Sequence, residues 1–346
     1  MAAKALRIAV VAPPWFEVPP AGYGGIESVC FDLVEGLVDI GHDVTLVAAG
    51  SSRTRAHFVQ ALREPAAGLG TPLAPVQEVR WAALANRALA DAATEHDVVH
   101  DHTLAGPLLA SGRAVPTVMT AHGPTDGPFG EYYAALGVPV VAISDYQRGS
   151  APNVRWVATV HNAVDVEAYP FREQKDDFVL FMARMSLEKG AHVAPEVCRR
   201  AGYPLVLAGK CREPEEQRYF EQEIARWLND DVRFVGEIAG EEKARYLSRA
   251  RCLLVPPQWD EPFGLASIEA LACGTPVVAL RRGALGELVD HGRTGWLCDD
   301  ASELEDGVRR AGEIDPHECR ADAARRFSRR AMAEAYAGVY RSLVAG

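Results

Sequence analysis

The sequence predicts an α/β protein built from two parallel-sheet domains. Short apolar runs typical of buried strands alternate with segments of helical periodicity, which is the order of repeated βαβ units. A chain of 346 residues is long enough for two domains of ordinary size. Because residues 167–177 are polar and charged, we expect an N-terminal domain over 1–166, a C-terminal domain over 167–328 and a closing segment over 329–346.

The N-terminal half contains a regular series of expected strands and helices. Apolar runs predict strands at 6–12, 44–49, 98–100, 117–121, 138–144 and 157–160. Apolar residues at helical spacing predict a helix over 26–37, which Gly41 ends, and a second helix over 81–95. The pattern weakens over 51–75, where we expect a surface region without an assigned role.

The C-terminal half continues the alternation. We expect strands at 178–185, 205–209, 232–235, 253–255 and 277–280, and a helix beginning within 186–190. Further helices are expected at about 213–228, 241–250 and 265–273, and a last one over 329–344.

Composition excludes several classes of protein. With 48% apolar and 24% charged residues, the chain is expected to be globular and soluble, and we place it in the cytoplasm. A net charge of −11 argues against a nucleic-acid partner and allows at most weak contact with an anionic membrane surface. No apolar run is long enough for a transmembrane helix. The seven cysteines lack metal-type spacing and are expected to be reduced packing residues.

The most informative segment is LLVPPQWDEPFGLASIEALACGTPVVAL, which runs from Leu253 to Leu280. It predicts a strand, an acidic loop, a helix and a second strand, and ligands of such folds bind beyond the carboxyl ends of the strands. Glu261 and Glu269 are separated by seven residues, and the helix begins between them. The first amides of that helix, near Phe263, Gly264 and Leu265, are a candidate phosphate site.

Carboxylates on either side of a bound diphosphate would accept hydrogen bonds from hydroxyl groups. A nucleotide-sugar has that arrangement, with sugar hydroxyls on one side of the diphosphate and ribose hydroxyls on the other. The alternative is that Glu261 and Glu269 are ordinary acidic residues favoured near the start of a helix.

The string from Glu261 to Ala279 resembles the Glu, seven residues, Glu signature of the retaining GT-B glycosyltransferases of family 4. The resemblance implies two Rossmann-like domains facing across a cleft, with the acceptor bound by the N-terminal domain and the nucleotide-sugar by the C-terminal domain. It implies that Glu261 holds the donor sugar and Glu269 the ribose, and that the last helix crosses back to the first domain. UDP is the commonest nucleotide of the family and GDP the next.

Two cations flank the expected turn after the strand at 178–185. Arg184 and Lys189 have the arrangement of a diphosphate clamp, although two cations five residues apart can also be unremarkable surface residues. The resembled family carries Arg and Lys at these places, usually after a Gly where this chain has Ala183. Gly209 and Ile238, at the ends of two other strands, correspond to positions that hold the nucleobase through backbone groups.

In the N-terminal half, Gly24 and Gly25 precede the first helix, where they would let a ligand approach the backbone or would simply form a tight turn. The family has a Gly-Gly pair here that faces donor phosphate and acceptor. His122 follows a strand and resembles the family's histidine that contacts the donor sugar. The chain departs from the family pattern at Ala163 and Arg282, each in place of a glycine.

Aromatic residues in two loops suggest an acceptor platform: Trp15, Tyr23, Phe129 and Tyr132, with Tyr133 beside them. His100 and His102 at a strand end could bind a metal, but no third ligand is apparent, and lining a cleft between domains is the alternative we favour. We therefore expect no metal ligand among the site residues.

The expected reaction is metal-independent hexose transfer with retention of configuration. The sequence has no Asp-x-Asp motif to hold a metal, so Arg184, Lys189 and helix amides would stabilise the departing diphosphate, and no cofactor is expected. In the resembled family the donor phosphate itself assists the acceptor hydroxyl, and His122 would orient the sugar. A sugar-nucleotide epimerase and a non-catalytic nucleotide-sugar-binding protein remain alternatives. A dinucleotide-dependent oxidoreductase lacks support because no Gly-x-Gly-x-x-Gly opens the first helix.

Overall fold

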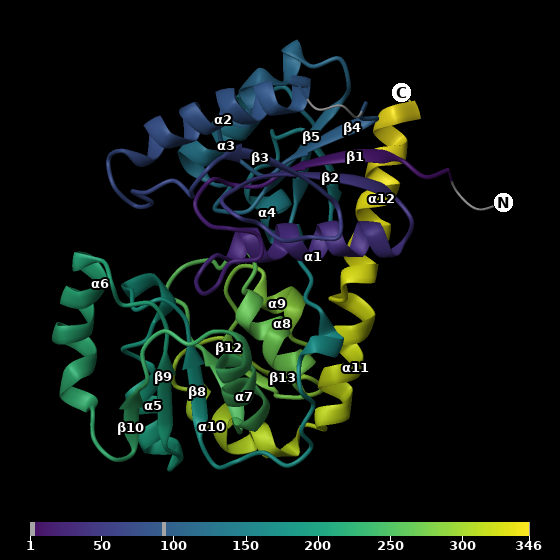
Figure 1. The fold of residues 1–346 in the computed structure, drawn as a ribbon. Coiled ribbons are helices and arrows are strands. Elements are labelled where there is room, and N and C mark those ends of the chain that lie inside the picture. Colours follow the sequence, from purple (N-terminus) through teal and green to yellow (C-terminus); the bar gives the residue numbers. More distant parts are fainter. Residues whose placement is uncertain (1–3, 92–94, 346) are drawn as a thin grey trace. The chain divides into compact units, whose positions relative to one another are not determined.

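A computed structural model describes residues 4–91 and 95–345 of the chain (Figure 1). The chain forms two compact units. Unit 1 contains the residues up to Ala163 together with those from Arg329 onward, and unit 2 contains Val164–Ser328. Each unit has its own parallel sheet and its own apolar core, so the predicted α/β class is confirmed.

Unit 1 has a seven-stranded parallel sheet with the strand order β3-β2-β1-β4-β5-β6-β7. Its strands are β1 Arg7–Val11, β2 Asp43–Ala49, β3 His57–Leu62, β4 Val98–Asp101, β5 Thr117–Ala121, β6 Val140–Ala142 and β7 Trp156–Thr159. The order reverses between β1 and β4, and ligands of such sheets bind beyond the strand ends at this reversal.

Strand β3 was not expected, because 51–75 was predicted only to be a surface region without an assigned role. It pairs with β2 at the edge of the sheet, and none of its residues is fully buried. A strand that is partly exposed on both faces has no apolar run and no clean alternation, so the sequence carries no periodic signal for it.

The helices of unit 1 are α1 Gly25–Asp39, α2 Ala74–Asp91, α3 Gly127–Ala135, α4 Asp145–Ser150 and α12 Arg329–Ala345, with a 3₁₀ segment η1 Gly106–Gly112. Helix α2 begins at Ala74 rather than at the predicted Trp81, and residues 92–94 of the predicted helix lie outside the described part. Helices α1 and α12 lie side by side (Figure 1), and Arg329 Nε is 2.5 Å from Asp32 Oδ1. Gly36 permits this close packing, since a Cβ there would lie 2.8 Å from the carbonyl oxygen of Arg329.

Unit 2 has a six-stranded parallel sheet with the order β10-β9-β8-β11-β12-β13. Its strands are β8 Val179–Met182, β9 Leu205–Ala208, β10 Val232–Phe234, β11 Cys252–Val255, β12 Val277–Leu280 and β13 Gly295–Cys298. Its helices are α5 Ala194–Ala201, α6 Pro214–Tyr219, α7 Gly240–Arg249, α8 Leu265–Ala272, α9 Leu285–Leu288, α10 Leu304–Arg310 and α11 Pro316–Arg326.

Two predicted helices of unit 2 differ from the structure. The helix expected to begin within 186–190 is a single 3₁₀ turn, η3 Leu187–Lys189, which ends at Gly190 with a φ of 75°, and α5 begins only at Ala194. The helix expected over 213–228 is α6 followed by a π-helical turn, η4 Phe220–Ile224, and a 3₁₀ turn, η5 Ala225–Trp227. Apolar spacing does not distinguish these tighter and wider turns from an α-helix.

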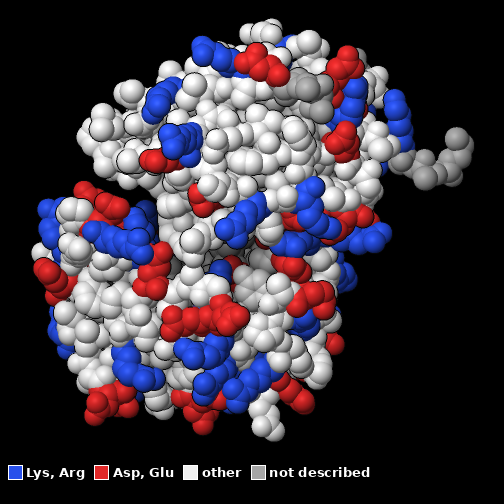
Figure 2. Space-filling view, viewed as in Figure 1, with Lys and Arg blue, Asp and Glu red and all other residues white. Residues whose placement is uncertain are grey.

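The surface carries charges of both signs. On the face in Figure 2, Lys and Arg side chains are interspersed with Asp and Glu, and the described residues form no extended basic patch there. No helix in residues 4–91 and 95–345 is long and apolar enough to cross a membrane. All seven cysteines are free, and Cys211 alone among them is not fully buried.

Candidate active site

In unit 2, the loops that follow the strands lie at one edge of the sheet, because parallel strands end at the same edge. The predicted donor residues lie in these loops: Arg184 and Lys189 after β8, Gly209 after β9, Ile238 after β10, and Glu261 with Phe263, Gly264 and Leu265 after β11. Strands β8 and β11 are neighbours, so the loops that follow them lie close together.

Glu261 and Lys189 contact each other directly. Lys189 Nζ lies 2.6 Å from Glu261 Oε2, and the indole N–H of Trp259 donates to the same oxygen at 3.0 Å. The ammonium group also lies 4.7 Å from the centre of the Trp259 ring. Within the described chain Glu261 Oε1 accepts no hydrogen bond, so one oxygen of this carboxylate is available to a hydroxyl group.

Glu269, in the second turn of α8, has a similar arrangement with different partners. The hydroxyl of Tyr169 donates to Glu269 Oε1 at 2.9 Å, and Lys243 Nζ lies 2.7 Å from the same oxygen. Both donors use Oε1, so Oε2 remains available in the part of the chain that the structure describes. Each of the two predicted acids thus keeps one oxygen without a protein donor.

Arg184 pairs with a residue of its own loop. Its Nη2 lies 2.5 Å from Glu188 Oε1, while its buried Nε has no hydrogen-bond partner. A buried guanidinium N–H without an acceptor is costly, and an anionic oxygen of a ligand would satisfy it. The orphaned Nε is therefore compatible with the predicted diphosphate clamp.

Helix α8 begins at a glycine. Gly264 has a φ of 104° and forms the N-cap, and its carbonyl oxygen accepts from the amide of Ser267 at 2.9 Å. The loop after β12 holds the preceding segment, because Ala284 N donates to Glu261 O at 2.8 Å. A Cβ on Gly283 would lie 2.3 Å from that same carbonyl oxygen, so the close approach needs a glycine.

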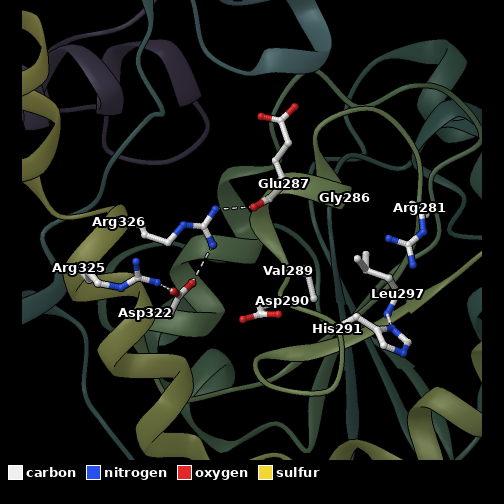
Figure 3. Close-up of a pocket in the computed structure, with 10 residues that line it drawn as sticks. All are labelled: Arg281, Gly286, Glu287, Val289, Asp290, His291, Leu297, Asp322, Arg325 and Arg326. Atoms are coloured by element: carbon white, nitrogen blue, oxygen red, sulfur yellow. Dashed lines mark hydrogen bonds and ion pairs between the residues drawn. The ribbon is translucent and has the colours of Figure 1, made fainter.

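A cavity of about 350 Å³ in unit 2 lies elsewhere (Figure 3). Its lining includes Arg325 and Arg326, and both guanidinium groups point toward the carboxylate of Asp322 and form ion pairs with it. None of the predicted donor residues lines this cavity. Its cations are already neutralised, so it is a weak candidate for an anionic donor.

In unit 1, His122 follows β5 and begins a chain of hydrogen bonds. Its Nε2 lies 2.8 Å from His102 Nδ1, and His102 Nε2 lies 3.2 Å from His100 Nδ1. His100 in turn contacts the hydroxyl of Tyr340 at 2.7 Å and that of Thr120 at 2.8 Å. His100 and His102 were expected to line a cleft, but His100 is fully buried and both rings are hydrogen-bonded within unit 1.

Burial favours the neutral form of all three imidazoles. Burial lowers the pKa of His122 to about 3 and lowers the pKa values of His100 and His102 well below their ordinary value. The neighbouring rings lower the pKa of His102 further, because a second positive charge within the chain would be repelled. A neutral histidine has one N–H donor and one bare nitrogen, so each ring must be oriented by its partners.

Gly24 and Gly25 lie at the start of α1, with Gly24 as the N-cap and Gly25 as the first helical residue, not before it. Gly24 has a φ of 151°, and a Cβ there would lie 2.8 Å from the Pro20 side chain. Glu27 follows in the first turn with one buried carboxylate oxygen, Oε1, without a partner. Burial raises the pKa of Glu27 to about 7, although the backbone amides of Glu27 and Phe16 oppose this.

The predicted acceptor residues are distributed over the surface and interior of unit 1. Tyr23 and Phe129 are exposed, while Trp15 donates its indole N–H to Glu78 Oε1 at 3.0 Å. Tyr132 donates its hydroxyl to the carbonyl oxygen of Leu104. Tyr133 was wrongly grouped with these residues, because it is buried in the apolar cluster between α3, β5 and β6.

No group of three or more His, Cys, Asp or Glu side chains in residues 4–91 and 95–345 is arranged to hold a metal ion. His100 and His102 use their ring nitrogens for each other, Thr120, Tyr340 and His122. The metal alternative for this pair is therefore not supported.

Two parallel-sheet units, with acids and cations at the strand ends of unit 2, are the features expected of GT-B glycosyltransferases. The sequence matches the family model of glycosyl transferases group 1 over residues 167–331 and that of glycosyltransferase family 4 over residues 23–168. The chain belongs to this family, and it is a glycosyltransferase that transfers a sugar from a nucleotide-sugar.

Curated relatives match most of the chain. It is 31% identical over 339 residues to the alpha-maltose-1-phosphate synthase of Mycolicibacterium smegmatis, with 84% of each chain covered. It is 27% identical over 360 residues to the glycogen synthase of Mycobacterium tuberculosis, with 88% of this chain and 85% of the relative covered.

Solved structures are similar over nearly the full length. AviGT4, a glycosyltransferase involved in avilamycin A biosynthesis, has a TM-score of 0.77 and 28% identity, with 99% of this chain and 98% of AviGT4 covered. Anabaena HepE, solved with UDP and glucose, has a TM-score of 0.74 and 18% identity, with 98% and 100% covered. The likeness to HepE shows the fold alone.

Several residues around the predicted site were not found from the sequence: Tyr169, Glu188, Lys243, Trp259 and Gly283. Trp259 lies within the segment that was singled out, and its place two residues before Glu261 was a usable signal. Lys243 and Tyr169 lie far from Glu269 in the sequence, and no local pattern points to them.

Proposed function

We propose that the protein is a metal-independent, retaining hexosyltransferase that uses a UDP-sugar, with a GDP-sugar as the next candidate. The observation that carries the proposal is the available carboxylate oxygen of Glu261 and of Glu269, on either side of the start of α8. Such oxygens accept hydrogen bonds from hydroxyl groups, which a nucleotide-sugar has on both sides of its diphosphate.

The donor would bind to unit 2. Glu261 would accept from a hydroxyl of the sugar and Glu269 from the ribose, while backbone groups near Gly209 and Ile238 would hold the base. HepE, whose fold this chain shares, has been solved with UDP-glucose, so a UDP-sugar is the first donor to test. The starch synthase IV catalytic domain of Arabidopsis thaliana has been solved with ADP, so the base has to be tested.

Departure of the diphosphate would be stabilised by fixed positive groups. Lys189, Arg184 with its orphaned Nε, and the first amides of α8 are the candidates, and together they would replace a metal ion. With no protein nucleophile assigned, the donor phosphate would assist the acceptor hydroxyl, and attack would occur on the face that the nucleotide leaves.

The acceptor would bind to unit 1 and would react through a hydroxyl group. Gly24 and Gly25 would allow close approach of donor and acceptor, and Trp15, Tyr23, Phe129 and Tyr132 would supply aromatic surface. His122 would orient the transferred sugar.

Binding measurements with a panel of nucleotide-sugars test this proposal. Melting temperature is measured with UDP-, GDP- and ADP-sugars, each with and without EDTA, because a ligand that binds the folded protein stabilises it by an amount that grows with the logarithm of its affinity. We expect a shift with the UDP-sugar that EDTA does not remove. Loss of the shift with EDTA would contradict metal independence, and no shift with any nucleotide would contradict the donor site.

Product analysis separates the alternatives. A transferase consumes the donor only when an acceptor hydroxyl is supplied, apart from slow hydrolysis. A sugar-nucleotide epimerase would convert the donor with no acceptor, and a non-catalytic binding protein would give a melting shift without any turnover.

A further inference from the structure

Lys175 lies shortly before β8, at the edge of the unit 2 sheet where the strands begin, and it donates three hydrogen bonds. Its Nζ lies 3.0 Å from the carbonyl oxygens of Ser248 and Cys273 and 2.9 Å from Thr275 Oγ1. Ser248 lies in the last turn of α7, Cys273 directly follows α8, and Thr275 precedes β12. The lysine therefore links the C-terminal ends of two helices to each other and to the start of a strand.

The three bonds of Lys175 match the three N–H groups of an ammonium group. Burial lowers the pKa of Lys175 to about 8, and no carboxylate among the described residues pairs with it to offset this. The ammonium form is still the main form at pH 7. A positive group is favourable at the end of a helix, because the last carbonyl oxygens have no partner within the helix.

The hydroxyl of Thr275 extends this link to α7. It accepts from Lys175 and donates to the carbonyl oxygen of Leu247 at 2.6 Å. Thr275 is fully buried. Two successive carbonyl oxygens of α7, those of Leu247 and Ser248, are thus held from the end of α8.

Helices α7 and α8 contact each other and carry one ion pair between them. Lys243 of α7 lies with its Nζ 2.7 Å from Oε1 of Glu269 in α8. With a rise of about 1.5 Å per residue, Ser248 lies about 7.5 Å along α7 from Lys243. Cys273 lies about 6 Å along α8 from Glu269. Because both distances are short and the helices are stiff, a shift of α7 at its C-terminal end would also move Lys243 relative to Glu269.

The second donor to Glu269 is held at the same end of α8. Tyr169 donates its hydroxyl to Glu269 Oε1. Arg320 of α11 donates from Nη1 to the carbonyl oxygen of Tyr169 at 2.7 Å and to that of Ala272 at 2.5 Å. A cation at the end of α8 therefore holds each of the two segments that supply a donor to Glu269.

We propose that Lys175 is a positioning residue of the nucleotide site. By fixing α7 against the end of α8 it places Lys243 on Glu269 Oε1, which leaves Glu269 Oε2 for a ribose hydroxyl. Lys175 itself does not touch the nucleotide, because it lies where the strands begin and the predicted donor residues follow the strands. This inference rests on the proposed function for the ribose as the ligand of Glu269.

The test compares a nucleotide with and without its ribose hydroxyls. UDP, or the diphosphate of the base that the melting panel selects, is titrated calorimetrically at pH 7 beside its 2′,3′-dideoxy form. We expect the wild type to prefer the hydroxylated nucleotide by about tenfold or more, and Lys175→Met to reduce this preference by at least about threefold. A general loss of stability would weaken both nucleotides alike, so an unchanged preference in Lys175→Met would overturn the positioning role.

A double variant tests whether Lys175 acts through Lys243. Lys243→Met should lower the preference for the hydroxylated nucleotide, and Lys175→Met added to it should lower the preference no further. If the two losses simply add, Lys175 acts independently of Lys243 and the proposal is wrong.

Two fully buried threonines of unit 2 provide a matched pair. Thr275→Val removes the hydroxyl between Lys175 and α7, whereas Thr294→Val removes one that accepts from the amide of Asp290 at 2.9 Å. Denaturant unfolding should show a loss of stability in both, but only Thr275→Val should lower the preference for the ribose hydroxyls. Equal preferences in the two variants would contradict the link, and this pair decides the matter even if Lys175→Met does not fold.

Failure of the proposed function would have a different result. If the wild type binds neither form of the nucleotide, or binds both equally, Glu269 does not hold the ribose and the proposed function is wrong at this step. If the wild type prefers the hydroxylated form, Glu269→Ala loses this preference and Lys175→Met keeps it, only the positioning role of Lys175 is overturned.

Discussion

Glu261 and Lys189 form an ion pair, with 2.6 Å between Nζ and Oε2. A diphosphate carries more charge than one carboxylate and would attract Lys189 away from Glu261. Trp259 keeps its bond to Oε2, so Glu261 is not left without a donor when Lys189 moves. In the proposed reaction the same lysine would exchange the carboxylate of Glu261 for the leaving diphosphate.

Lys189→Ala should weaken UDP binding by about tenfold to a hundredfold, the usual effect of losing a charge-assisted hydrogen bond. Calorimetric titration with UDP measures this. Arg199→Ala is the control, because Arg199 is an exposed cation on α5 that pairs with Glu196. Equal affinities of Lys189→Ala and wild type would contradict the clamp.

Glu269→Ala should raise the KM for the donor by at least about tenfold, because two ribose hydroxyls lose their acceptor. Tyr169→Phe is the matched control. It removes one donor to Glu269 Oε1 and leaves the carboxylate in place, so its KM should change much less. Steady-state kinetics with the donor varied measures both, and an unchanged KM and kcat in Glu269→Ala would exclude the ribose role.

Glu27 makes the stability of unit 1 depend on pH. Its pKa is raised to about 7 by burial, so the folded protein holds this proton more tightly than the unfolded chain does. The stability gained from the protonated form is present below about pH 4.5 and is lost as the pH rises through about 7. The buried histidines act in the opposite direction, because their pKa values are lowered, so a comparison with a variant is needed.

Glu27→Gln should therefore raise the free energy of unfolding at pH 8 by up to about 3 kcal/mol and change it little at pH 4.5. Denaturant unfolding at the two pH values measures the difference. Glu35→Gln, in the same helix, should instead lower the free energy of unfolding at pH 8. Burial raises the pKa of Glu35, but hydrogen bonds from Arg55 and Thr54 outweigh this and lower it. A destabilised Glu27→Gln at pH 8 would contradict the assignment.

At the scale of elements, the turn after β8 is fixed against the turn after β11. Gln258 N donates to Glu188 O at 2.7 Å, and a Cβ on Gly190 would lie 1.9 Å from the Pro256 carbonyl oxygen. This contact positions Lys189 next to Glu261, so the glycine serves the site as well as the fold.

Gly190→Ala should destabilise unit 2 and weaken UDP binding, because its Cβ overlaps backbone that cannot move aside cheaply. Gly202→Ala is a close control. Gly202 has a similar φ of 82°, and no atom lies within 4 Å of its added Cβ, so that variant reports the left-handed strain alone, about 1 to 2 kcal/mol. Thermal melting and UDP titration compare the two, and equal effects would exclude the turn contact.

At the scale of the whole molecule, each unit has its own sheet and core, and we assign the donor to unit 2. Hydrogen exchange followed by mass spectrometry tests the assignment. UDP should slow the exchange of amides in residues 184–190 and 258–269, where the candidate ligands lie. If UDP protects neither segment from exchange, the assignment of the donor to unit 2 is contradicted. Gly190→Ala should reduce the protection that UDP gives.

The segment from Leu253 to Leu280 shows how much the sequence by itself determined. Its strand, loop, helix and strand match β11, α8 and β12 within a residue, because an apolar core and a helix start leave local signals. The family and the class of reaction follow from the same segment. The sequence did not reveal β3, an edge strand that exists because β2 offers it a partner.

Tertiary structure alone decided which side chains meet. Lys189 and Glu261 are 72 residues apart, Lys243 and Glu269 are 26 apart, and His100 and Tyr340 are 240 apart. The spacing of apolar residues shows only which face of a strand or helix is buried. It does not show which other element covers that face. These contacts arise from the order of strands in the two sheets and, within unit 1, from the packing of α12 against α1 and β4, which no local pattern encodes.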